Sequence, residues 1–120
     1  MKRDQRLRRR SDFQRAYRQG RVHGNQLLVL RILPNGGPVT RFGFVVGKAV
    51  GGAVVRNRVR RRLREIARMF ACRPGLDIVI NARRITAEAQ FGQLREAMGT
   101  LLERGRALQP APPPSTEEQA

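Results

Sequence analysis

Apolar residues recur along this chain with two different periods, and each period predicts a different kind of element. In residues 54–70 (VVRNRVRRRLREIARMF) they return every three or four positions. At about 100° per residue such positions fall on one side of a helix, so the segment is expected to be an amphipathic helix with one face toward a core. This apolar face consists of Val55, Val59, Leu63, Ile66 and Phe70.

A shorter helix is predicted near the start of the chain, over residues 11–19 (SDFQRAYRQ). Ser11 is suited to cap its first turn and Gly20 to end it. Phe13 and Tyr17 are four residues apart and therefore share one face. Their spacing leaves two interpretations open. They are either aromatic residues that anchor the helix on a core, or a platform on which unpaired bases stack.

A last helix is predicted over residues 87–104, with Thr86 as its N-cap and Gly105 at its end. Its apolar positions again recur at helical spacing, which gives it one face for the core. They are Phe91, Leu94, Met98, Leu101 and Leu102.

Three shorter segments have the apolar, β-branched and aromatic character of strands. They are residues 25–33 (NQLLVLRIL), 40–47 (TRFGFVVG) and 76–81 (LDIVIN), the last of which is expected to be central in the sheet. The PNGGP sequence between the first two predicts a chain reversal. The order α-β-β-α-β-α predicts an α+β fold in which helices cover one small sheet. Residues 46–76 form a β-α-β crossover in this scheme, and its default hand, where the strands are parallel, is right-handed.

The length of 120 residues predicts one domain, which is expected to occupy residues 11–106. Residues 1–10 (MKRDQRLRRR) are polar and basic and are expected to form a mobile arm. Residues 107–120 are rich in proline and poor in large apolar side chains. This composition predicts a disordered tail.

The charge of the chain points to an anionic partner. Its 25 basic and 9 acidic residues give a formal net charge of +16, so the chain repels itself unless an anion shares that charge. Residues 54–70 alone hold seven arginines against one glutamate. Like charges four residues apart destabilise a helix by a few tenths of a kcal/mol each, which favours a surface compensated by bound anions. Nucleic acid is the favoured partner, and an anionic membrane surface is the weaker alternative.

Residue counts argue against several other kinds of chemistry. Cys72 and His23 are the only cysteine and histidine, which excludes an intramolecular disulfide and a Cys/His metal cluster. His23 is interpreted as a loop residue, and Cys72 as a small apolar side chain at a helix end. The GKAVGG segment lacks the spacing of a phosphate-binding P-loop. Lys48 is interpreted instead as a residue that contacts phosphate. The carboxylates are scattered, unlike those of a two-metal nuclease centre.

The chain also lacks the signals of membrane insertion or export. No apolar run reaches the ~18 residues of a membrane span, and the charged N-terminal segment is not followed by the apolar region of a signal peptide. A cytoplasmic location is therefore expected.

Three segments in this order resemble the family of bacterial ribonuclease P protein subunits. AVVRNRVRRRLRE (residues 53–65) matches the family's signature helix, RLRRRSDFQRAYRQGR (residues 6–21) its N-terminal segment, and DIVINARR (residues 77–84) its last strand. The resemblance covers roughly residues 6–102. An Arg-Asn-Arg sequence alone is weak evidence, but three collinear segments at matching spacing are specific.

The resemblance implies a function and a fold. Proteins of this family bind a large catalytic RNA, one to one, and the two together remove the 5′ leader of precursor transfer RNA. The RNA with its Mg²⁺ performs the hydrolysis, and the protein binds no cofactor of its own, holds the leader and lowers the magnesium requirement. The family fold resembles domain 2 of ribosomal protein S5 and has the element order above. Its crossover is left-handed, which we expect here in place of the default hand.

The resemblance also implies site residues, and the charged helix face agrees with it. The expected RNA-binding residues are Lys48, Arg56, Asn57, Arg58, Arg60, Arg61, Arg64 and Arg68. The expected leader-binding cleft consists of Phe13, Tyr17, Arg15 and Arg31. There are departures from the family pattern, because Ala49 stands where a second lysine is common, Gly52 where asparagine is common, and Arg31 where an aromatic residue is frequent. The cleft is thus expected to depend more on charge and less on stacking.

Two other functions share some of these features. A small ribosomal or other structural RNA-binding protein would have the same charge without the aromatic cleft. A cationic protein of the membrane surface would have the amphipathic helix, but here strands and a second amphipathic helix are present to cover its apolar stripe.

Overall fold

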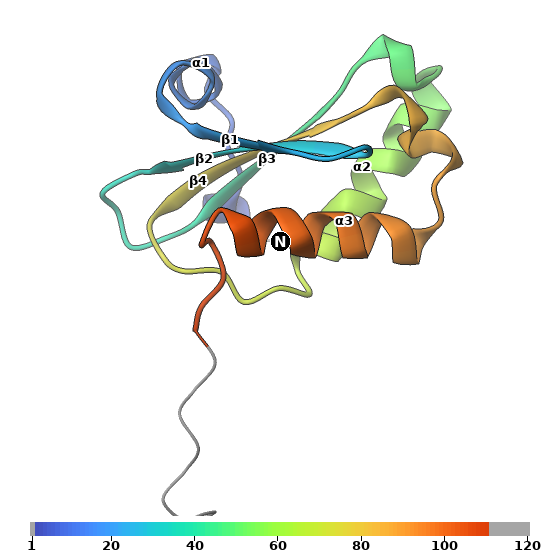
Figure 1. Ribbon diagram of the computed structural model, residues 1–120. Coiled ribbons are helices and arrows are strands. Elements are labelled where there is room, and N and C mark those ends of the chain that lie inside the picture. Colours follow the sequence, from blue (N-terminus) through green and yellow to red (C-terminus); the bar gives the residue numbers. More distant parts are fainter. Residues whose placement is uncertain (1, 111–120) are drawn as a thin grey trace, which may run out of the picture.

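The computed structural model describes residues 2–110 and contains one four-stranded sheet flanked by helices on both faces (Figure 1). Three single-turn 3₁₀ helices, η1, η2 and η3, complete it. In chain order the elements are η1 (Arg3–Gln5), α1 (Arg10–Gln19), β1 (Arg21–Gly24), β2 (Leu28–Pro34), β3 (Arg41–Val46), η2 (Lys48–Val50), α2 (Ala53–Ala67), β4 (Leu76–Ala82), η3 (Arg84–Glu88) and α3 (Phe91–Arg104). The expected α+β class is confirmed.

The strands lie in the order β1-β2-β4-β3, so β4 is central, as its sequence predicts. It pairs antiparallel with β2 and parallel with β3. β3 and β4 are therefore adjacent parallel strands joined through α2, which is the β-α-β crossover expected from the sequence. Its left hand stays a prediction from the resemblance.

The two faces of the sheet have different roles. One is covered by α2 and α3 and the other by α1, which lies alone above the sheet in Figure 1. Alternate residues of β2, β3 and β4 point to the α2–α3 side and are apolar there, for example Leu28, Leu30, Ile78 and Ile80. They join the apolar faces of the two long helices in the main core. A strand alternates its side chains between faces, so the intervening residues face α1.

The α1 face has a smaller apolar cluster. Leu7, Ala16 and Val79 are buried in it, and the ring of Phe13 packs against the cluster. A methyl group at Gly43 of β3 would lie 2.4 Å from the Phe13 ring, so glycine at this position lets α1 approach the sheet. Polar and charged side chains of the strands, among them Arg31, Arg41, Asp77 and Asn81, also lie on this face.

An ion network lies between α1 and the sheet. Asp77 is 1% exposed and receives two bonds from the Arg41 guanidinium, Nε to Oδ1 at 2.9 Å and Nη2 to Oδ2 at 2.8 Å. Asn35 donates to the same carboxylate at 2.9 Å. Arg41 also reaches the buried carboxylate of Asp12 on α1, at 3.5 Å. The hydrogen bond to Asp77 raises the pKa of Arg41, so this guanidinium keeps its charge at every physiological pH.

One strand was not expected. β1 pairs with β2, and it contains His23, which we interpreted as a loop residue. The RVHG sequence of β1 is short and has one large apolar residue, so no alternation marks it. It becomes a strand because β2 offers an unpaired edge immediately beyond a tight connection.

The two expected N-caps are wrong, whereas Gly20 ends α1 as predicted. α1 begins at Arg10 with Arg9 as its N-cap, so Ser11 lies inside the first turn. Thr86 is buried in η3, where its hydroxyl donates to the carbonyl of Arg83, and α3 starts five residues later behind a capping box of Gln90 and Gln93. Gly105 ends α3 as predicted.

Both chain ends of the domain extend further than expected. In place of a mobile arm, residues 2–9 pack along the outer edge of β3, where the Leu7 amide donates to the carbonyl of Phe42 at 2.9 Å. At the other end Ala107 is fully buried, and Leu108 bridges to Cys72. The remainder of the predicted tail, residues 111–120, lies outside the described residues.

The ion network generates a stability prediction. Arg41→Met should lower the free energy of unfolding by about 2–4 kcal/mol, because it leaves the Asp77 carboxylate buried beside no cation. Arg15→Met is the matched control. Arg15 also pairs with Asp12, but its side chain is 48% exposed, so its loss should change stability by under about 1 kcal/mol. Urea denaturation followed by circular dichroism measures both. Equal losses for the two variants would contradict a special role of the buried pair.

Candidate nucleic-acid interface

α2 is anchored as its apolar period predicts. Val59, Leu63 and Ile66 are fully buried in the main core. Phe70 lies beyond the end of the helix, half-buried, with its ring against Gly99 of α3. The helix is thus held rigidly along one side, and the orientation of its arginines is fixed by the core.

The other faces of α2 carry the arginines expected from the sequence. Arg61 and Arg68 are exposed, and so is Asn57, whose side-chain oxygen accepts from Arg60 at 2.8 Å. Arg56, Arg58 and Arg64 are partly buried, and their Nε atoms are enclosed without a hydrogen-bond partner. Packing against the helix therefore restrains these side chains at their stems, while the guanidinium ends extend toward solvent.

The α2 arginines have no carboxylate partners within residues 2–110. The ion pairs of this region join Asp12 or Asp77 to Arg15 or Arg41, all on the α1 side of the sheet. Glu65, the one acidic residue of α2, makes none of them. The helix therefore presents uncompensated positive charge. Lys48, exposed in η2 just before α2, adds to it.

The N-terminal segment brings a further cation to this surface. Arg6 lines a hollow of about 560 Å³ together with Arg61, Arg64, Glu65, Arg68 and Met69. Burial lowers the pKa of Arg64, and the positive charges of Arg6 and Arg60 lower it further. The sequence does not mark Arg6 as a site residue, because the composition of residues 1–10 predicts a mobile arm. The available signal was Leu7, the one large apolar side chain between Arg3 and Arg10.

The expected leader cleft is assembled only in part. The guanidinium of Arg31 lies over the ring of Tyr17, 4.3 Å from its centre, in a cation–π contact. Asn81 of β4 connects the two, accepting from Arg31 at 3.0 Å and donating to the Tyr17 hydroxyl at 2.7 Å. Tyr17 is nevertheless 42% exposed. Asn81 was not predicted as a site residue, because its role depends on strand pairing between β2 and β4.

The other two expected cleft residues have structural contacts. Phe13 packs inward against the cluster of Leu7, Ala16 and Val79, which agrees with the anchoring interpretation, and its contact with the leader stays a prediction. Phe13 anchors α1, and Tyr17 remains available to a ligand. Arg15 donates to Asp12 at 3.0 Å, which occupies part of its hydrogen-bonding capacity.

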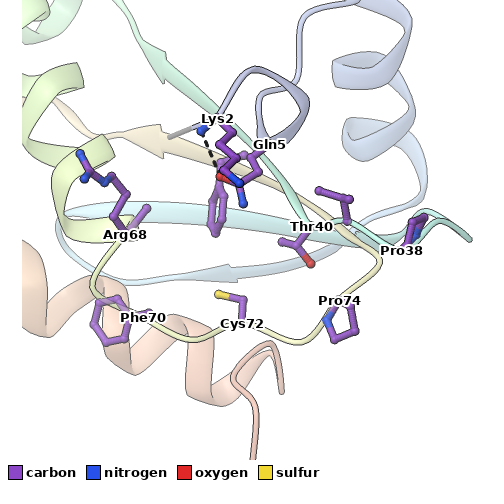
Figure 2. Close-up of a pocket in the computed structure, with 11 residues that line it drawn as sticks. Lys2, Gln5, Pro38, Thr40, Arg68, Phe70, Cys72 and Pro74 are labelled. Carbon is purple, nitrogen blue, oxygen red and sulfur yellow. Dashed lines mark hydrogen bonds between the residues drawn. The ribbon is translucent and has the colours of Figure 1, made fainter.

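A second hollow, of about 560 Å³, lies beneath the N-terminal turn (Figure 2). Lys2 and Gln5 line one side and Phe70, Cys72 and Pro74 the other, with Arg68 at one end. Burial raises the pKa of the Cys72 thiol to about 11. The thiol is therefore protonated at neutral pH and has the structural character expected from the sequence.

The described part of the chain offers no group of three or more His, Cys, Asp or Glu side chains placed to hold a metal ion. None of its helices is both long enough and apolar enough to cross a membrane.

Comparison with known proteins gives a consistent result. A family model described as Ribonuclease P matches residues 1–106. The chain is 44% identical over 114 residues to the ribonuclease P protein component of Roseiflexus castenholzii, covering 92% of this chain and 93% of that one. It is 42% identical over 112 residues to the component of Symbiobacterium thermophilum, covering 91% and 97%.

Solved structures agree. The RNase P protein from Thermotoga maritima superimposes with a TM-score of 0.76 at 34% identity, covering 82% of this chain and 96% of that one. The Staphylococcus aureus RNase P protein gives a TM-score of 0.79 at 26% identity, with 88% and 98% covered.

Burial of Cys72 generates a chemical prediction. Because its raised pKa leaves little thiolate, alkylation by iodoacetamide at pH 8 should be at least about tenfold slower in the folded protein than in the same protein unfolded in guanidinium chloride. Mass spectrometry over time measures both rates from the single cysteine. Equal rates would mean that the thiol is accessible and ionises normally.

Proposed function

The chain belongs to the ribonuclease P protein family, and from this premise we propose that α2 binds the phosphate backbone of the ribonuclease P RNA. The observation that carries the proposal is the arginine surface of α2, which has no carboxylate partner in the described residues. Arginine suits this role because its planar guanidinium can bond two phosphate oxygens at once. The residues proposed to contact RNA are Lys48, Arg56, Asn57, Arg58, Arg60, Arg61, Arg64 and Arg68.

The chain has the role of a ribonuclease P protein subunit and acts in transfer RNA processing. We assign the hydrolysis itself to the RNA with its Mg²⁺. The side chains gathered on α2 are arginines, which stay protonated and neutralise phosphate but do not act as general bases. The protein would favour the reaction by offsetting repulsion between the RNA and its precursor substrate. One protein per RNA and a cytoplasmic location, where precursor transfer RNA is processed, belong to the same proposal.

The family membership decides between the functions left open by the charge. A small ribosomal protein or a membrane-surface protein accounts for the basic composition, but neither accounts for matches that run through nearly the whole domain to proteins of one family.

We further propose that the α1 side of the sheet receives the single-stranded 5′ leader. The Tyr17 ring is exposed on one side and supported on the other by Arg31, so a base can stack on the outer side of the pair. Asn81 donates to the Tyr17 oxygen, which leaves the hydroxyl hydrogen free to donate to an acceptor on the RNA. Phe13 then has a positioning role, because its ring packs over Gly43 and so sets the distance between α1 and the sheet.

The first functional prediction concerns magnesium. Adding the protein to a bacterial ribonuclease P RNA should increase cleavage of precursor transfer RNA at low Mg²⁺, and the increase should decline as Mg²⁺ rises and screens the phosphates itself. Gel analysis of the released leader measures the rate. A variant with Arg61 and Arg64 both replaced by alanine should give a smaller increase. No gain from the unaltered protein would overturn the proposed function.

The second concerns Tyr17. In the assembled enzyme Tyr17→Ala should weaken binding of precursor transfer RNA by at least about fivefold, the equivalent of one lost stacking contact of about 1 kcal/mol. Binding of mature transfer RNA, which has no leader, should be unchanged. Tyr17→Phe is the matched control, since it keeps the ring and removes only the hydroxyl, and it should lose less. Equal losses for precursor and mature transfer RNA would show that Tyr17 does not contact the leader.

A further inference from the structure

Residues 2–9 form a docked segment, which we call the N-terminal strap. β3 is an edge strand, and the strap lies along its free side in a parallel bridge between Arg6 and Phe42. The Leu7 amide donates to the Phe42 carbonyl at 2.9 Å, and the Leu7 side chain is 7% exposed, in the cluster with Ala16 and Val79. The position of Arg6, next to this anchor, is therefore set by the fold.

The anchored strap places Arg6 against α2. Arg6 shares a hollow with Arg61, Arg64 and Arg68, whose charges are opposed there only by Glu65. The charge of Arg6 is close enough to Arg64 to lower the pKa of its guanidinium. Four arginine side chains from two separate segments thus line one hollow, although their mutual repulsion opposes the docking of the strap.

The Arg64 side chain is restrained at this point. Its Nε is enclosed without a partner, so the stem cannot swing freely away from Arg6. A phosphodiester group has the charge and the acceptor oxygens to bond both guanidinium groups at once. Its binding would replace a repulsive contact by two attractive ones.

We propose that the strap and α2 form one composite phosphate-binding site, in which Arg6 and Arg64 hold the same stretch of RNA backbone and Arg61 and Arg68 flank it. The proposal rests on the proposed function and adds to it a second segment of the chain and a pairing between particular side chains. RNA binding at this site also holds the strap against β3, because the bound phosphate joins it to α2.

A double-mutant cycle tests the pairing. Affinity for a bacterial ribonuclease P RNA is measured by filter binding over a range of salt concentrations for the unaltered protein, Arg6→Ala, Arg64→Ala and the double variant. Arg6→Ala should weaken binding at least about fivefold and reduce the log–log salt slope by about 0.7–0.9, the value for one lost phosphate contact. The double variant should lose at least about threefold less than the product of the two single losses, since residues sharing one partner are not additive.

Arg104→Ala provides the matched control. Arg104 is exposed at the end of α3, and its loss removes the same charge from the protein. When Arg104→Ala is combined with Arg64→Ala, the loss of RNA affinity should equal the product of the two single losses. If Arg6→Ala behaves like Arg104→Ala, in size and in additivity, both with the RNA alone and with precursor transfer RNA on the assembled enzyme, the composite site is overturned. If the unaltered protein does not bind the RNA, the proposed function fails as well, which distinguishes the two failures.

Leu7→Ala tests the need for docking without changing any charge. It loosens the strap and should weaken RNA binding at least about threefold, while circular dichroism shows that the fold is kept. Unchanged affinity in the folded variant would overturn a requirement for the docked strap.

The bound phosphate can belong either to the RNA subunit or to the precursor, and the two sources are distinguished by the Arg6→Ala variant. A loss by Arg6→Ala with the RNA subunit alone assigns it to the subunit, and a loss seen only with precursor transfer RNA on the assembled enzyme assigns it to the substrate. A loss in neither arm contradicts the site.

Discussion

Side chains along β4 alternate between the two faces of the sheet, and the functional features are positioned by that alternation. Ile78 and Ile80 point into the core under α2 and α3. On the opposite face Asp77 binds Arg41, Val79 packs with Leu7, and Asn81 connects Tyr17 to Arg31. Because β4 is paired on both sides, a shift of its register by one residue would exchange the two faces and remove all of these contacts together.

The placement of the acidic residues decides where positive charge accumulates. The chain has 25 basic and 9 acidic residues, and two of the carboxylates, Asp12 and Asp77, are buried on the α1 side of the sheet. They neutralise Arg15 and Arg41 there and leave α2 without partners. The uncompensated charge of the α2 arginines therefore lies on the surface proposed to meet phosphate.

Sequence periodicity predicted those parts of the fold that depend on apolar burial. The stripe of α2, the face of α3 and the central position of β4 follow from residues that must leave water, and the structure confirms them. What could not be predicted depends on pairing between segments distant in sequence. β1 has almost no pattern of its own, and it exists because β2 offers an edge. Asn81 gains its contacts only when β2 brings Arg31 beside it, which its own sequence position does not indicate.

The docking of the strap is another feature that sequence periodicity could not predict. Its composition is that of a solvated basic tail, and only Leu7 departs from it. That side chain contacts Phe13 and Ala16 of α1, while its backbone is bonded to β3. Leu7 therefore lies between the α1 side of the sheet, proposed to receive the leader, and Arg6 on the α2 side, proposed to bind phosphate. α1 begins at Arg10, directly after the strap. One docked segment therefore contributes an apolar side chain to the cluster under α1 and a cation to the hollow beside α2.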